Sequence, residues 1–279
     1  MRRLATVVTA LALGAAAGCG GSSHPPVDPE RMLDSAAAHP IHGADVEIDA
    51  RLQVEGLSQL AQPLRLKLEG PYQGSGGSAI PRFDWRLSAE ALGFPVGGRL
   101  VSTGSNVYLS VYGNDYELGT SAVAAANGRL AELAAAGHPL AANARRWFGR
   151  PRYDGEASAG GTDCERVSAP LKGDALVADL APLAAALGVS EPLGITGRAK
   201  GCIGYDDRVM HGLEVDARLA IPPVDQPRLG GATGARLDVD VTASDVNRPQ
   251  QIAAPHGSFR PITDLLLTLN DLGLHIPIG

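Results

Sequence analysis

Three cysteines offer two kinds of sulfur chemistry in this sequence. Two of them, Cys164 in GTDCERV and Cys202 in AKGCIGY, lie in the body of the chain. In an exported chain such a pair is typical of a disulfide, and two free thiols or half of a metal site are the alternatives. Because no CxxC occurs and the seven histidines are scattered, we expect a disulfide between Cys164 and Cys202.

The third cysteine, Cys19, directly follows an uncharged N-terminal segment. Met1-Arg2-Arg3 is positively charged, and residues 4–17 carry no charge. This layout is typical of an export signal and is too short for a comfortable membrane span. Ala16-Ala17-Gly18-Cys19 resembles a bacterial lipobox, whose cysteine becomes thioether-linked to diacylglycerol. We expect a signal peptide over residues 1–18 and an acylated Cys19, with a plain secretory signal as the alternative.

Acylation would place the chain on the extracytoplasmic face of the cell membrane, because two or three acyl chains give durable attachment. Residues 19–29 are rich in Gly, Ser and Pro and predict a flexible tether. Removal of residues 1–18 leaves 22 basic against 30 acidic residues, a net charge near −8. This balance argues against nucleic acid as a partner and against a polybasic membrane patch.

Arg145-Arg146 stands beside Trp147-Phe148, a combination that could bind an anionic group. Guanidinium groups match the geometry of phosphate, so a phosphate or glycan headgroup is one hypothesis for Arg145 and Arg146. The alternative is a helix end whose cations interact with the helix dipole.

Catalytic chemistry has little support in the sequence. No G-x-S-x-G, H-E-x-x-H or Walker motif occurs. His39 and His42 bracket Pro40 and are typical of a solvated loop. The Asp206-Asp207 pair in CIGYDDRVM is more typical of a β-turn than of a carboxylate dyad. We therefore expect no enzyme activity, no metal and no cofactor.

Strict alternation of apolar and polar residues is the strongest structural pattern. It occurs in ADVEIDARLQVEG, LRLKLEG, FDWRLSAEA, NVYLSVYG, LEVDARLAI and ARLDVDVTA. Gly and Pro clusters separate these runs, which predicts strands of one antiparallel sheet with one wet face. The apolar positions expected to face inward and line a cavity are Val46, Ile48, Leu52, Val54, Leu66, Leu87, Val107, Leu109, Val111, Val215, Leu219 and Val239.

Helical patterns are fewer. PERMLDSAAA follows a capping Asp28 with proline in the first turn, and further helices are expected over residues 122–133, 139–148, 174–188 and 261–272. Pro182 is expected to kink or split the fourth of these. The order is helix, strands, helical insertion and strands, which predicts an α+β fold with helices on one face of a strongly curved antiparallel sheet.

Three stretches resemble a known family. SNVYLSVYGNDYELG looks like its tyrosine-bearing strand pair, residues 143–184 look like its passage from a helical insertion through a strand pair into a helix, and ARLDVDVTASDVNRPQQIAAP looks like its closing strand. The chain is similar here to the actinobacterial LppX/LprA/LprF/LprG lipoproteins, within the LolA- and LolB-like carriers. The resemblance covers most of residues 30–255, whereas the cysteine pair and the tail from Pro261 are departures from it.

The resemblance implies a half-barrel sheet with helices over its concave face, enclosing an apolar cavity for acyl chains in a domain over residues 30–260. It does not specify the lipid headgroup. The residues alone leave two possibilities, because an aliphatic inner face must be covered either by dense packing or by a hydrophobic ligand. Only 4% of the chain is aromatic, and the expected helices are rich in alanine, which favours a gap.

Two functions follow as hypotheses. The first is a membrane-anchored lipoprotein that carries a lipid or glycolipid through the cell envelope, with an envelope transporter as a possible partner. The second is a non-enzymatic structural or sensor lipoprotein that displays a protein-binding surface. In PITDLLLTLNDLGLHIPIG, several leucines share one helical stripe. Residues 261–279 are therefore expected to form a lid or plug over the open side of the sheet, with a helix that is simply part of the core as the alternative.

Overall fold

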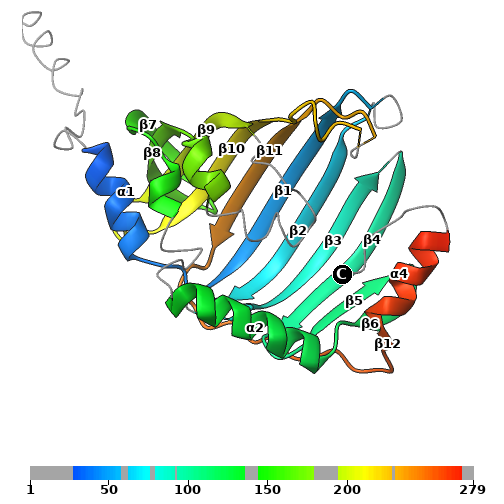
Figure 1. Ribbon diagram of the computed structural model, residues 1–279. Coiled ribbons are helices and arrows are strands. Elements are labelled where there is room, and N and C mark those ends of the chain that lie inside the picture. Colours follow the sequence, from blue (N-terminus) through cyan, green and yellow to red (C-terminus); the bar gives the residue numbers. More distant parts are fainter. Residues whose placement is uncertain are drawn as a thin grey trace, which may run out of the picture.

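The computed structural model describes residues 28–57, 62–75, 79–91, 93–135, 144–178, 194–227 and 230–271. These residues form one large curved sheet with helices along its margins (Figure 1). The expected signal peptide, Cys19 and most of the tether lie outside the described residues. None of the described helices combines the length and the apolar character that crossing a membrane requires.

The first strand of the chain and its last long strand are neighbours in the middle of the sheet. The described strands are β1 (Gly43–Glu55), β2 (Leu64–Gln73), β3 (Arg82–Ala91), β4 (Phe94–Thr103), β5 (Val107–Val111), β6 (Asn114–Glu117), β7 (Arg152–Ala159), β8 (Thr162–Pro170), β9 (Gly194–Gly204), β10 (Met210–Ala220), β11 (Gly234–Ser244) and β12 (Arg260–Pro261). Their spatial order is β12-β6-β5-β4-β3-β2-β1-β11-β10-β9-β8-β7. All neighbours are antiparallel except β12 and β6.

The six alternating runs of the sequence all lie in strands of this sheet, as predicted. Only the family resemblance implied β6, β7 and β8, and the two-residue β12 was not predicted. β4 and β9 were not predicted either, because glycines interrupt their alternation. In β4 a side chain at Gly98 would lie 2.5 Å from the carbonyl oxygen of Ser110, and in β9 one at Gly197 would lie 2.1 Å from that of Asp216. The backbones approach closely at these points, so glycine is required there without breaking the strand.

Helix α1 (Pro29–Ala38) has the N-cap that the sequence predicts. The Asp28 carboxylate accepts hydrogen bonds from the N–H groups of Glu30 at 3.0 Å and Arg31 at 3.5 Å. The apolar side of α1 packs on β8 and β9, where Met32, Leu33 and Val167 are part of a buried cluster. The first helix therefore closes one end of the sheet.

Three further helical segments border the sheet. Helix α2 (Thr120–Ala135) extends the predicted segment, and α4 (Ile262–Asp271) lies within the predicted tail helix. In the third region we expected a helix over residues 139–148, and this is wrong for the described part. That part forms only the 3-10 turn η2 (Ala144–Trp147), after which Phe148 pairs with Leu171. Residues 173–178 are helical, and the rest of the segment expected at 174–188 lies outside the described residues.

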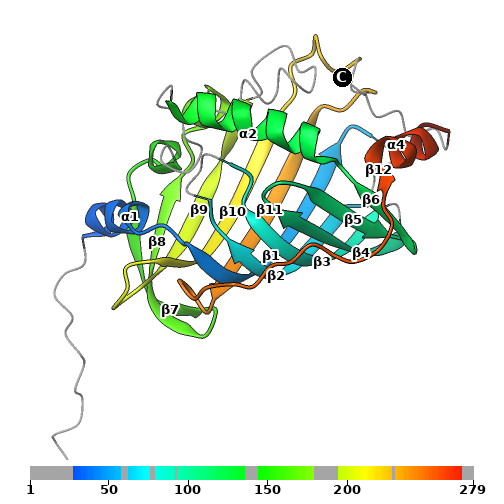
Figure 2. The same ribbon diagram turned by 90° about the horizontal axis from the view of Figure 1, so that it is seen from below.

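Figure 2 shows that the sheet is bent into a trough, with α2 over its open side and α1 and α4 at its two margins. After β11 the chain crosses the strand ends to reach β12. This strap is fixed by hydrogen bonds from the Arg82 guanidinium to the Ile252 carbonyl and from the Gln250 N–H to the Gln73 side chain at 3.0 Å. Pro261, the first residue of the tail that looks like an addition to the family pattern, thus belongs to an edge strand of the same sheet.

A disulfide joins Cys164 in β8 to Cys202 in β9, as the sequence predicts. The two Cα atoms are 5.4 Å apart, and both residues are buried. The bond links two neighbouring strands at the end of the sheet that α1 covers.

We expect replacement of Cys164 and Cys202 by alanine to lower the free energy of unfolding by about 3–4 kcal/mol in the chain-entropy model, because the bond spans a sequence separation of 38. Urea unfolding of the variant against the oxidised wild type measures this difference. Reduced wild type should behave like the variant, and equal stability of all three would contradict the expectation.

Candidate functional site

The inner face of the sheet is apolar because its register aligns aliphatic side chains across many strands. Ile48 of β1 lies opposite Leu68 on one side and Val241 on the other. The same row continues through Leu87 and Leu213. Directly opposed side chains in an antiparallel sheet share one face. The result is a continuous apolar surface across the central strands.

All twelve residues that the sequence places inward do share this face, and every one is half-buried. By contrast, side chains beneath α1 are fully covered, such as Val167 with 1% exposure. The centre of the inner face is therefore less tightly covered than the end at α1. That these twelve residues line a ligand cavity remains a prediction.

One end of the inner face is filled by the protein itself. Leu33 of α1 and Phe148 after η2 pack over β8, β9 and β10, and the space left among them has a volume of about 10 Å³. A space of this size holds at most about one water molecule and is far too small for an acyl chain. Any ligand site on this face therefore lies toward the central strands.

Aromatic side chains mark another part of the same face. Phe83 and Trp85 of β3 stack with their ring centroids 4.1 Å apart. The buried Trp85 Nε1 has no hydrogen-bond partner among the described residues. The alternating pattern of β3 identified this face but gave no indication that the two rings would stack.

The side chain of Asn127 fixes helix α2 across the strand ends that lie at the bottom of Figure 1. Asn127 accepts a hydrogen bond from the N–H of Ile80 at 2.7 Å and donates one to the carbonyl of Gly104 at 2.9 Å. Val123 on the same helix is fully buried. These contacts hold α2 over the trough, which is the placement that the α+β prediction requires.

The outer face is hollowed, and its lining is charged. A groove of about 960 Å³ runs over β9, β10, β11 and β1. The register aligns five charged residues in one row across these strands and β2: Lys67, Asp49, Asp240, Glu214 and Lys200. At the two ends of the row, Lys200 pairs with Glu214 and Lys67 pairs with Glu47, each at 2.7 Å. Burial raises the pKa of the Asp240 carboxyl in this row, and the negative charges of Glu214 and Asp49 raise it further. A groove of this chemistry does not suit an acyl chain.

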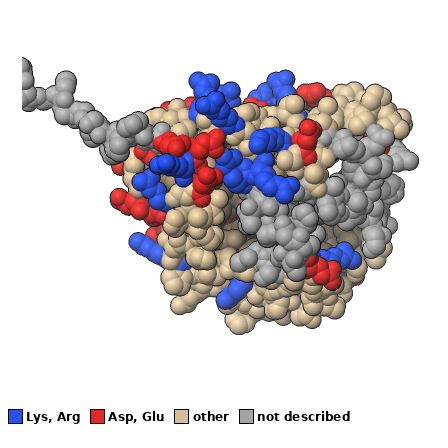
Figure 3. Space-filling model, turned by 60° about the vertical axis from the view of Figure 1, so that its left-hand side comes forward, with Lys and Arg blue, Asp and Glu red and all other residues tan. Residues whose placement is uncertain are grey.

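Arg145 has a structural contact that the sequence did not reveal. Its guanidinium pairs with Glu30 and, at 2.9 Å, with Asp34, both in α1. These contacts fasten η2 to the first helix. Figure 3 shows this end of the molecule, where Lys, Arg, Asp and Glu side chains are interspersed. A role for Arg145 and Arg146 in binding a headgroup remains a prediction.

The remaining titratable candidates form turns and caps. Asp206 and Asp207 lie in the β9–β10 turn, as expected. Burial alone would raise the pKa of the Asp207 carboxyl, but hydrogen bonds from the Val209 N–H at 3.0 Å and the buried His211 ring at 2.8 Å lower it overall. No group of three or more metal-ligating side chains is assembled within the described ranges.

The sequence resemblance has counterparts among solved structures. No family model and no curated protein matches the chain. LprF from Mycobacterium bovis is 15% identical, with a TM-score of 0.48 over 82% of this chain and 97% of that one. LppX from Mycobacterium tuberculosis is 12% identical, with a TM-score of 0.46 over 81% and 98%. A LolA superfamily protein from Nitrosomonas europaea is 8% identical, with a TM-score of 0.25 over 81% and 95%.

The predicted resemblance to LprF and LppX is thus confirmed as a likeness. With identities and TM-scores this low, the likeness carries no argument about a ligand. The function must be argued from the geometry of this chain.

We expect Arg145→Met to lower the free energy of unfolding by about 1 kcal/mol, because it removes partly exposed ion pairs that hold η2 on α1. Arg150→Met, at an exposed arginine three residues after η2, serves as the matched control, and thermal unfolding of both variants measures the difference. A change in lipid selectivity with unchanged stability would instead support the headgroup role of Arg145.

Proposed function

We infer that this chain is an envelope lipoprotein whose concave inner face holds the acyl chains of a lipid or glycolipid. The observation that carries the proposal is the half-buried apolar surface across the central strands, described above for Ile48 and its neighbours. Each aliphatic side chain that stays partly exposed to water loses stabilisation of about 25 cal/mol for every Å² of apolar surface that is not buried. An acyl chain would cover this area without requiring further protein side chains.

The dimensions of the trough agree with such a ligand. β1 has 13 residues, and at about 3.3 Å per residue such a strand extends over roughly 43 Å. The apolar rows cross at least five neighbouring strands. A long flexible hydrocarbon fits a broad aliphatic surface, because its recognition needs contact area rather than directed hydrogen bonds.

Anchoring through an acylated Cys19 completes the proposal. It would keep the domain beside the membrane from which the lipid comes, and an envelope transporter or a second membrane would then deliver or receive the cargo. The alternative is a structural or sensor lipoprotein, for which the charged outer groove is the surface that a protein partner could use. The two functions differ in whether the inner face binds lipid.

Ala50→Trp tests the inner face directly. Ala50 is half-buried in the centre of β1 between Leu66 and Val239, so an indole there should occupy the space of an acyl chain. We expect uptake of a fluorescent fatty acid to fall about tenfold, in line with the loss of one well-covered apolar contact. Ser88→Trp, on the outer face of β3, is the matched control and should bind as the wild type does.

Organic extraction of the purified, unacylated protein followed by mass spectrometry supplies the second readout. Recovered lipid from wild type, and less from Ala50→Trp, would support the carrier function. If wild type yields no lipid and takes up no fatty acid, the carrier function is wrong and the display of a protein-binding surface becomes the better proposal.

The anchor is tested by Cys19→Ser. Without the thiol no thioether to diacylglycerol can form, so we expect the protein to move from the detergent phase to the aqueous phase in a phase-partition experiment. The wild type and a neighbouring Ser22→Ala variant should stay in the detergent phase. Detergent partitioning of the Cys19→Ser protein would count against acylation at this residue.

A further inference from the structure

The turns at one end of the sheet form a distinct surface. β1, β3, β5 and β10 end there, and β2, β4, β6 and β11 begin there, because these strands alternate in direction. We call the described residues of these four turns the rim: 56–57, 62–63, 93 with Phe94, 112–113, 221–227 and 230–233. In Figure 1 the rim follows the upper and right-hand ends of these strands, next to the inner face.

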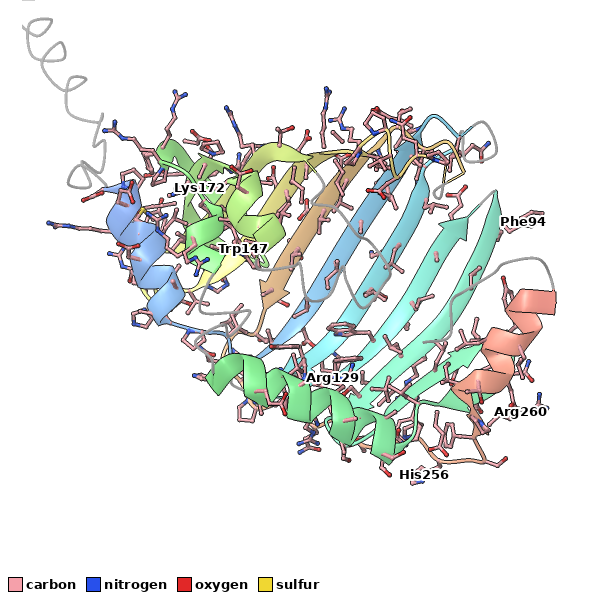
Figure 4. The ribbon with its side chains drawn as sticks, viewed as in Figure 1. Phe94, Arg129, Trp147, Lys172, His256 and Arg260 are labelled. Atoms are coloured by element: carbon pink, nitrogen blue, oxygen red, sulfur yellow. A yellow bond between two sulfur atoms is a disulfide. The ribbon has the colours of Figure 1, made fainter. Side chains whose placement is uncertain are left out.

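The rim carries the three most exposed large apolar side chains in the described part of the chain. Phe94 is 71% exposed, Tyr112 is 70% exposed and Val224 is 62% exposed. Each belongs to a different turn. Figure 4 shows Phe94 standing clear of the end of β4. Exposure of this kind is a cost in water unless the side chains meet an apolar partner.

Tyr112 is also placed against its backbone preference. Its φ is 51°, in the left-handed region where glycine and asparagine are favoured. Tight hairpin turns of this kind normally use Asn-Gly or Asp-Gly. The sequence instead places Tyr112 before Gly113. An aromatic residue kept at a strained turn position favours a role for its ring outside the fold.

Charge separates the rim from the other end of the sheet. Among the described rim residues, Asp225 is the single charged one, and it is buried at 6% exposure. The described turns at the opposite end carry Asp206, Asp207, Arg208, Asp245 and Arg248. The β8–β9 connection lies at the same end of the sheet and carries Lys172 and Asp174 in its described part, two charges of opposite sign. A chain with a net negative charge would therefore meet an anionic lipid surface with least repulsion through its rim.

The point where the chain enters the fold lies on the rim side of α1. The helix runs from its first residue at the upper end in Figure 1 down toward the start of β1, at the opposite end of the sheet from the rim. Residues 19–28 could span at most about 33 Å when fully extended. A lipid anchor at Cys19 would thus keep the start of α1, which faces the rim end of the sheet, within about 33 Å of the membrane.

We propose that the rim docks on the surface of a lipid bilayer through Phe94, Tyr112 and Val224. The three side chains are distributed along an arc of several strands, and neighbouring strands in a sheet lie about 4.8 Å apart. Such spacing suits a broad, deformable surface better than the contiguous core of a protein interface. Phe and Tyr are also suited to the boundary between headgroups and acyl chains. The proposal rests on the proposed carrier function, because docking would bring the apolar trough to its source of lipid.

The test uses the unacylated chain from residue 20 onward, which retains every described element, and vesicles of phosphatidylcholine with phosphatidylglycerol, which present an anionic surface. Phe94→Ser combined with Tyr112→Asn removes both rings, while asparagine relieves the strained backbone. We expect binding in vesicle co-sedimentation to fall about tenfold or more, with thermal stability equal to or above that of wild type. Leu118→Ser is the control, because Leu118 is 40% exposed but lies at the opposite end of β6.

Uptake of a monomeric fluorescent fatty acid is measured in parallel. Loss of vesicle binding in the double variant with unchanged uptake would support docking. Unchanged vesicle binding by the double variant, an equal loss in Leu118→Ser, or absence of binding by wild type would overturn it. If no variant takes up fatty acid but the double variant alone loses vesicle binding, the docking surface stands and the carrier function fails.

Discussion

The central pairing of β1 with both β2 and β11 is the constraint on which the rest of the structure depends. β1 lies in the middle of the sheet, so the first and the last long strands of the chain are neighbours. Because side chains alternate between faces, a slip of one residue in either pairing would turn aliphatic residues outward and charges inward. The register of this one strand therefore fixes the chemistry of both faces.

The two faces are then stabilised in different ways. On the outer face, charges of opposite sign lie across neighbouring strands, as in the pairs Lys200–Glu214 and Arg236–Asp216. Each of these exposed pairs contributes little stability, but together they favour exposure of this face to solvent and the observed register of the strands. On the inner face, the aliphatic rows gain stability only to the extent that something covers them.

Coverage of the inner face is uneven, and this difference separates the structural part from the candidate site. Near β8 and β9 the disulfide, α1 and the Arg145 contacts produce a packed end with almost no residual space. Over the central strands the corresponding side chains remain half-buried. A rigid end beside a less covered centre is an arrangement that can hold a guest without loss of the fold.

The sequence alone determined the elements whose pattern is local. Alternation identified six strands and the face of each residue, the Asp28 cap located α1, and the isolated cysteine pair indicated the disulfide. Alternation did not identify β6, β7 and β8, which only the family resemblance implied, or the two-residue β12. It also missed β4 and β9, because glycines such as Gly98 and Gly197 are required by close backbone approach, a property of the neighbouring strand. Only the tertiary structure decided the strand order, the contact of Arg145 with α1 and the gathering of Phe94, Tyr112 and Val224 at one end, because each depends on segments far apart in the chain meeting in space.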